Sequence, residues 1–133
     1  MAAHRPRWHD ASTVTTTVLV VDDHAGFRAS ARALLEAEGF RVVGEAADGL
    51  DALTEAAALR PTLVLLDVQL PGLDGIAVAE VLAGLPDPPV VVLVSSRDAS
   101  AYGARLSQAA ARGFLAKADL SGEALTALLR GGP

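Results

Sequence analysis

Five short apolar runs recur along this chain, and they constrain its fold more than any other feature of the sequence. Most are nearly uninterrupted and lack the polar alternation of a half-exposed strand; they occupy residues 18–21, 40–43, 63–66, 90–94 and 114–116. Such runs are typical of strands that are buried on both faces, as in a parallel sheet covered by helices. The sequence therefore predicts an α/β fold.

The segments between these runs carry apolar residues at helical spacing. Four stripes are clear, and they comprise Phe27, Ala31, Leu34 and Leu35; Val78, Val81, Leu82 and Leu85; Tyr102, Leu106, Ala109 and Ala110; and Leu125, Leu128 and Leu129. A fifth helix, Ala-rich and weakly amphipathic, is expected over residues 50–59. Five strands that alternate with five helices predict one domain, with a five-stranded parallel sheet and helices on both of its faces.

Length and composition agree with one globular domain. The chain has 133 residues, of which 51% are hydrophobic, and it contains no Cys, which excludes disulfides and thiolate metal sites. Its net charge of −5 disfavours direct binding of nucleic acid by this chain. Residues 1–17 lack the apolar segment of a signal peptide, and no apolar run is long enough to cross a membrane. We therefore expect a flexible leader over residues 1–17 and a cytoplasmic protein without membrane contact.

Polar side chains follow four of the five predicted strands at the point where each strand ends. Asp22 and Asp23 follow the first strand, Asp67 the third, Ser95 the fourth and Lys117 the fifth. Each has an ordinary structural explanation by itself, since Asp caps helices and Ser begins turns. In open parallel sheets, however, the carboxyl ends of the strands border one crevice in which ligands bind. The five residues together predict one shared site.

The residue types at this edge suit phosphoryl transfer. Clustered carboxylates repel one another, and a hard divalent cation such as Mg²⁺ relieves that repulsion through oxygen ligands. A Lys ammonium and a Ser hydroxyl can donate hydrogen bonds to phosphoryl oxygens. An Asp carboxylate can act as a nucleophile and form an aspartyl phosphate. The set predicts metal-assisted phosphorylation of Asp67.

Four motifs, in this order, resemble the receiver domain of bacterial two-component response regulators. They are VLVVDDH (18–24), LVLLDVQLPGLDG (63–75), VVLVSS (91–96) and GFLAK (113–117). The resemblance implies a receiver domain over residues 18–130 with the flavodoxin-like (βα)5 fold of the CheY-like superfamily and the strand order 2-1-3-4-5.

The resemblance also implies a role for each matching residue at the acidic edge. Asp67 would be the phosphoacceptor, and Asp23 and Asp67 would bind Mg²⁺ directly. Asp22 would reach the ion through water, and the backbone carbonyl of Gln69 would complete the protein ligands.

Two further positions carry the phosphoryl contacts and the switch of the family. Ser95 and Lys117 would contact phosphoryl oxygens and form the catalytic set with Asp67. Phe114 stands at the position of the family's switch aromatic, whose side-chain conformation is coupled to Ser95.

The resemblance further implies a donor and a reader for the phosphoryl group. A phosphorylated His on a sensor histidine kinase, or on a histidine phosphotransfer protein, would be the donor, and the domain would catalyse only its own phosphorylation and dephosphorylation. A downstream protein would read the face formed by the fourth helix, fifth strand and fifth helix, and phosphorylation could also drive homodimer formation. We expect this face to include Tyr102, Arg105, Gln108 and Arg112.

Two interpretations of the whole protein stay open. The chain ends at Pro133, just after the last apolar stripe, and we expect a stand-alone receiver that acts through protein contacts. The alternative is the excised receiver of a transcription regulator, because the continuation Lys117-Ala118-Asp119 is similar to the subgroup usually fused to helix-turn-helix DNA-binding domains.

Other functions fit the residues less well. A haloacid-dehalogenase-type phosphatase also uses a strand-end Asp nucleophile and Mg²⁺, but it needs a second Asp where this chain has Gln69. A Ser-His-Asp hydrolase would need a G-x-S-x-G elbow, and nucleotide binding would need a Gly-rich loop that is missing here. A receiver-like module that is not phosphorylated would lose site residues, whereas all five are present.

Overall fold

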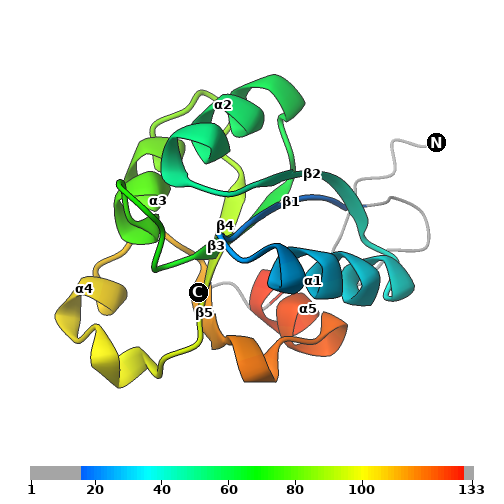
Figure 1. Cartoon of the computed structure of the whole chain (residues 1–133). Coiled ribbons are helices and arrows are strands. Elements are labelled where there is room, and N and C mark those ends of the chain that lie inside the picture. Colours follow the sequence, from blue (N-terminus) through cyan, green and yellow to red (C-terminus); the bar gives the residue numbers. More distant parts are fainter. Residues whose placement is uncertain (1–15, 131–133) are drawn as a thin grey trace.

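The computed structural model describes residues 16–130, and it places five strands in one parallel sheet (Figure 1). The strands are β1 (Thr17–Val21), β2 (Arg41–Ala46), β3 (Leu63–Asp67), β4 (Val90–Ser95) and β5 (Gly113–Ala116). Their order in the sheet is β2-β1-β3-β4-β5, and every neighbouring pair is parallel. The predicted strands, their order and their direction are therefore confirmed.

Helices cover both faces of this sheet, as expected. They are α1 (Ala25–Ala37), α2 (Gly49–Leu59), α3 (Gly75–Ala83), α4 (Ala104–Ser107) and α5 (Gly122–Arg130), with short 3₁₀ turns η2 (Ala99–Ala101) and η3 (Lys117–Asp119). Figure 1 shows α1 and α5 together on one side of the sheet and α2 and α3 on the other. No helix within residues 16–130 has the length and apolar character needed to cross a membrane.

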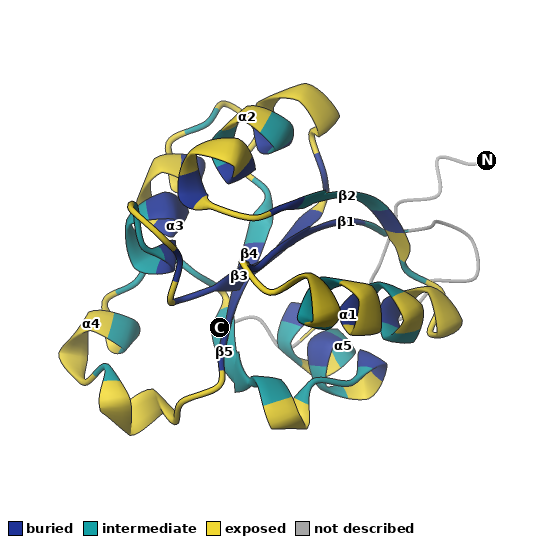
Figure 2. Ribbon diagram, in the orientation of Figure 1, coloured by how far each residue is buried: buried dark blue, intermediate teal, exposed yellow. Residues whose placement is uncertain are grey.

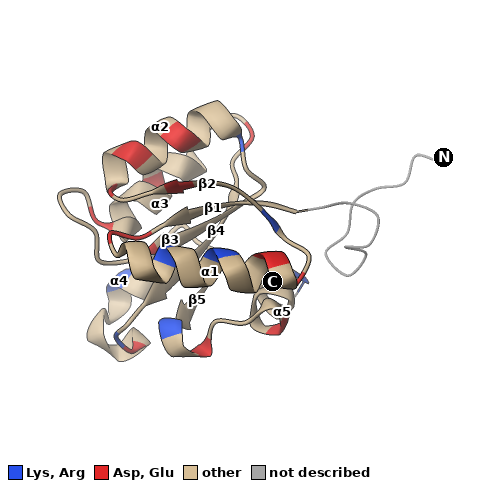
Figure 3. Cartoon of the chain, turned by 45° about the vertical axis from the view of Figure 1, so that its right-hand side comes forward, with Lys and Arg blue, Asp and Glu red and all other residues tan. Residues whose placement is uncertain are grey.

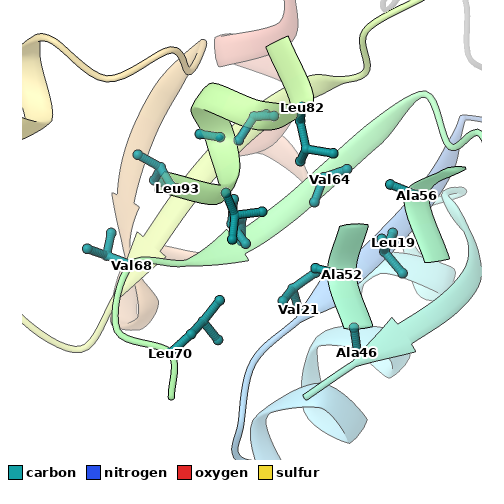
Figure 4. Packing of buried hydrophobic residues seen from close by; sticks show 14 residues of the cluster. Leu19, Val21, Ala46, Ala52, Ala56, Val64, Val68, Leu70, Leu82 and Leu93 are labelled. Atoms are coloured by element: carbon teal, nitrogen blue, oxygen red, sulfur yellow. The ribbon is translucent and has the colours of Figure 1, made fainter. Parts of the chain in front are cut away.

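Alternate residues of the central strands form two hydrophobic cores, one on each face of the sheet. In β1, Leu19 and Val21 belong to the core beneath α2 and α3, whereas Val18 and Val20 belong to the core beneath α1 and α5. The first core is drawn in Figure 4, and Figure 2 shows how completely the central strands are buried. Burial of a Leu or Val side chain stabilises the fold by about 1.5–3 kcal/mol. Both faces are dry, which explains why the apolar runs show no alternation.

The helix predicted from Tyr102 to Ala110 is much shorter than its apolar spacing indicated. The chain forms the turn η2, is interrupted at Gly103 with a φ of 57°, and then makes only the four residues of α4. Positive φ interrupts a helix and favours glycine. Most of residues 98–108 are exposed, so little apolar burial is available to stabilise a longer helix.

Two further details differ from the pattern expected from the sequence. Val81 was counted in the apolar stripe of α3 but is 50% exposed, and the buried face of that helix is formed by Val78, Ala79 and Leu82 instead. Thr17, the last residue of the predicted leader, already belongs to β1. The predicted leader otherwise falls on residues 1–15, which lie outside the described residues, and on Thr16.

Candidate functional site

The pairing of the strands brings the ends of β1, β3, β4 and β5 to one level. Val21 of β1 lies beside Leu66 of β3, and Asp67 lies beside Val94 of β4. Ser95 then lies beside the last residue of β5. The residues at and just beyond these strand ends therefore meet at one edge of the sheet, as the sequence predicts.

Three carboxylates and one imidazole gather at this edge. Single ligand atoms of Asp22, Asp23, His24 and Asp67 all lie within 4.8 Å of one another. Asp22 is fully buried and Asp67 is only 4% exposed. The side chain of Asp23, by contrast, is 35% exposed, so the cluster opens toward solvent on that side. A site of this form can admit a hard cation that keeps some of its water ligands.

Lys117 is the cation nearest to the buried carboxylates. Its Nζ lies 2.5 Å from Oδ2 of Asp22 and 3.2 Å from Oδ2 of Asp67, and 4.4 Å from the ring centroid of Phe27. The ammonium is thus the cationic partner of the buried Oδ2 of Asp22, and it lies between the two inner carboxylates.

The clustering of three carboxylates is the main evidence that the residues fit a metal ion. Lys117 supplies one positive charge at this edge, so a further cation would relieve the remaining repulsion among the carboxylates. Asp22, Asp23 and Asp67 together offer the oxygen ligands that Mg²⁺ prefers. The residue set therefore fits a divalent cation.

Burial and mutual repulsion separate the pKa values of the two inner carboxyls. Burial and, to a smaller extent, the Asp22 carboxylate raise the pKa of Asp67 to about 6. The Gln69 N–H, which donates to Oδ1 at 3.0 Å, and Lys117 act in the opposite direction. Burial also acts to raise the pKa of Asp22, but Lys117 and the His24 N–H, which donates at 2.8 Å, hold it below its usual range. Asp67 is thus the carboxyl whose ionisation most needs a further cation.

Ser95 is buried, and its hydroxyl already has partners. The N–H of Arg97 donates to Ser95 Oγ at 3.0 Å, and the hydroxyl of Tyr102 lies 2.5 Å from the same oxygen. The Tyr102 ring also packs edge-on against Phe114, with 6.4 Å between the ring centroids. A buried phenol hydroxyl usually finds such a partner.

Three of the residues expected on the partner-reading face make contacts within the chain. The Tyr102 hydroxyl contacts Ser95 Oγ. Arg105 donates to Asp74 Oδ2 at 2.6 Å, and Arg112 donates to the carbonyl of Leu129 at 2.8 Å, so both guanidinium groups have partners within the chain.

Arg28 supports the acidic pair, although no pattern in the sequence points to it. Its guanidinium donates to the backbone carbonyl of Asp22 at 2.6 Å and to Oε1 of Glu45 at 3.0 Å. Arg32 donates to the other oxygen of Glu45 at 2.9 Å. In Figure 3 the ribbon of α1 carries blue segments, which mark Lys and Arg, and the ribbon of α2 carries red segments, which mark Asp and Glu. The contact depends on β2 lying beside β1, which only the folded sheet brings about.

His24, the residue that precedes α1, also lies close to the acidic pair. Its Nδ1 lies 3.2 Å from Asp22 Oδ1 and 3.1 Å from Asp23 Oδ1.

The turn after β3 is packed tightly against Asp67. The N–H of Gly75 donates to the Val68 carbonyl at 2.9 Å, and a Cβ on Gly75 would clash with the backbone carbonyl of Asp67. Asp74 caps α3 by accepting the Ala77 N–H at 2.9 Å. This close approach holds the end of β3, and thus Asp67, against the start of α3.

Comparison with known proteins identifies the family. The model of the response regulator receiver domain matches residues 18–130. The chain belongs to this family. It is 37% identical over 110 residues to the transcription regulator BvgA of Bordetella pertussis, covering 83% of this chain and 53% of that protein. It is 43% identical over 102 residues to the response regulator GacA of Pseudomonas aeruginosa, covering 75% of this chain and 47% of that protein.

Solved structures agree with this assignment. The signal receiver domain of the response regulator NarL from Mycobacterium tuberculosis is 38% identical and superposes with a TM-score of 0.74, covering 84% of this chain and 90% of that one. The chain is thus a receiver domain of two-component response regulators, as the motifs predict. It spans about half the length of the curated relatives named above.

Proposed function

We propose that this receiver domain accepts a phosphoryl group on Asp67 in the presence of Mg²⁺. Asp22, Asp23, Asp67 and the backbone carbonyl of Gln69 would hold the ion, with Asp22 reaching it through water. When bound, the ion supplies positive charge that lowers the cost of ionising Asp67 and of gathering phosphoryl oxygens beside it. The observation that carries the proposal is the buried Asp67 carboxylate, grouped with Asp22 and Asp23 and 3.2 Å from the Lys117 ammonium.

The chemical step is a transfer between two side chains. An oxygen of the Asp67 carboxylate attacks the phosphorus of a phosphohistidine, and the P–N bond breaks as its electron pair goes to the imidazole nitrogen, which takes up a proton. An acyl phosphate remains on Asp67. Lys117 and Ser95 would contact its oxygens; Lys117 is already at the site and need only exchange carboxylate partners for phosphoryl ones. Hydrolysis by water would later restore the carboxylate.

The donor and the reader follow from membership of the family. A sensor histidine kinase or a histidine phosphotransfer protein in the cytoplasm would supply the phosphoryl group, and the domain would catalyse no reaction on separate substrates. A protein partner, or a second phosphorylated copy, would read the face of α4, β5 and α5. Phe114, which packs against Tyr102, would be the switch aromatic that connects this face to Ser95.

A DNA-binding output is the second candidate for the whole protein. BvgA, at 37% identity, is named a transcription regulator, and this chain covers only about half of its length. The relatives therefore support the transcription-regulator alternative more than the expected stand-alone receiver.

Intact-mass measurement tests the proposed phosphorylation. The purified protein is incubated with a small phosphodonor such as acetyl phosphate, with Mg²⁺ or with a chelator. We expect a gain of one phosphoryl group that depends on Mg²⁺ and is lost in Asp67→Asn. Asp87→Asn is the matched control, because that carboxylate is 91% exposed and precedes β4, whereas Ser95 lies at the other end of this strand. A folded wild-type protein that gains no Mg²⁺-dependent adduct would contradict the proposal, and turnover of phosphomonoesters would favour the phosphatase alternative.

A further inference from the structure

The hydroxyl of Ser95 already has two partners, Arg97 and Tyr102. A Ser hydroxyl has one hydrogen to donate and two lone pairs that accept. The Arg97 N–H occupies one lone pair, at 3.0 Å. The Tyr102 hydroxyl, at 2.5 Å, takes either the single hydrogen or the second lone pair. When Ser95 donates its hydrogen to Tyr102, a phosphoryl oxygen on Asp67, which also accepts, must compete with Tyr102 for that hydrogen.

Tyr102 belongs to a segment that is weakly attached to the rest of the fold. Residues 98–107 form two short helical turns separated by Gly103, whose φ is 57°. Within this segment, only Tyr102 and Leu106 pack against the hydrophobic core. Arg105 adds one ion pair to Asp74, at 2.6 Å. The Ser95–Tyr102 hydrogen bond is thus one of few contacts that tie this segment to β4.

We propose that Tyr102 is a positioning residue that holds the Ser95 hydroxyl in the unphosphorylated protein and releases it when Asp67 is phosphorylated. The inference rests on the proposed function, because it needs a phosphoryl group to draw Ser95 away. Release leaves the Tyr102 hydroxyl without its partner and loosens residues 98–107. The ring of Tyr102 contacts Phe114 edge-on, so its movement also changes the packing of the proposed switch aromatic.

The energetic consequence is a bias toward the unphosphorylated arrangement. A ligand can shift a conformational equilibrium only by its difference in affinity for the two states. One hydrogen bond made only in the unphosphorylated state therefore weakens binding of a phosphoryl mimic by about 2- to 10-fold, as judged from the usual net strength of such a bond.

Tyr102→Phe removes the hydroxyl and keeps the ring that packs against Phe114. Binding of beryllium trifluoride, a tetrahedral mimic of a phosphoryl group on a carboxylate, is measured by calorimetry with saturating Mg²⁺. We expect the Tyr102→Phe variant to bind it about 2- to 10-fold more tightly than the wild type. The matched control is the same change on a Ser95→Ala background, where it should have no effect because the partner hydroxyl is absent.

A second measurement reports on the phenol itself. Tyr102 is the one tyrosine of the chain, so incorporation of 3-fluorotyrosine gives a single fluorine resonance. The resonance should shift when beryllium trifluoride is added with Mg²⁺, and the shift should be lost in Asp67→Asn.

The outcomes separate the two proposals. A wild-type protein that binds no beryllium trifluoride in Mg²⁺ overturns the phosphorylation of Asp67 and, with it, the role of Tyr102. A wild-type protein that binds the mimic, while Tyr102→Phe binds it equally or more weakly, overturns the role of Tyr102 alone. Thermal unfolding of each variant establishes that the comparison is made between folded proteins.

Discussion

The Asp67→Asn substitution should make the metal-free protein more stable at neutral pH. Asp67 is 4% exposed and lies beside the Asp22 carboxylate, and these surroundings raise its pKa from 3.8 to about 6. A carboxyl whose pKa is higher in the folded state than in the unfolded chain opposes folding once it must ionise. Asn is nearly isosteric, can still accept the Gln69 N–H, and carries no charge.

The size of the effect follows from the two pKa values. The difference between 3.8 and about 6 corresponds to about 3 kcal/mol of unfolding free energy, at about 1.4 kcal/mol per pH unit. Below about pH 4 the carboxyl is protonated in both states, and the two proteins should be equally stable. The excess unfolding free energy of Asp67→Asn over the wild type grows as the pH rises from about 4 to about 6, and it reaches its full value above that range.

Urea unfolding with a chelator, at about pH 4 and about pH 7.5, measures this difference. Saturating Mg²⁺ should reduce the difference in unfolding free energy between Asp67→Asn and the wild type. At a free concentration of about 100 times its dissociation constant, the ion stabilises the wild type by about 2.7 kcal/mol and Asp67→Asn by much less. Asp87→Asn, at an exposed position, should leave the urea unfolding curve unchanged at both pH values. An Asp67→Asn variant that is no more stable than the wild type at about pH 7.5 without metal would refute the reasoning.

Three further substitutions test the surroundings of the site. Gly75→Ala should lower the unfolding free energy by about 1–3 kcal/mol in urea, because its Cβ would clash with backbone, whereas Gly26→Ala has open space and should not destabilise. Arg28→Ala should weaken Mg²⁺ binding about tenfold in calorimetry, since the Asp22 carbonyl loses its donor; unchanged affinity would contradict this role. Arg32 and Arg28 hold the pKa of Glu45 below 4.5, so Glu45→Gln should lower the unfolding free energy by about 1 kcal/mol in urea at neutral pH. This loss should disappear as the pH falls through the folded-state pKa of Glu45, and a loss that persists in acid would argue against the ion pairs.

The strands and the acidic edge were predictable from the sequence for definite physical reasons. A strand buried on both faces must be apolar throughout, so Leu63–Leu66 is recognisable without any partner. Parallel strands end at the same edge, so the residues that follow them, such as Asp67 and Lys117, were expected to meet. These rules depend on the residues within one strand and directly after it, so they can be applied to the sequence alone.

The surroundings of the site were less predictable because they depend on contacts between distant segments. Arg28 reaches Glu45 across 17 residues of sequence only because β2 lies beside β1. Helical spacing around Tyr102 predicted a long helix, but Gly103 divides the segment and leaves it with little buried surface. Spacing alone does not report such an interruption.

The sequence by itself determined the α/β class, the parallel sheet and the residues that gather at its edge, because each follows from local hydrophobicity and strand direction. Only the tertiary structure decided how those residues are partnered. It placed the Lys117 ammonium 2.5 Å from the buried Oδ2 of Asp22, and it turned the Tyr102 hydroxyl toward Ser95. Both depend on distances between side chains from different elements, which packing sets and sequence spacing does not.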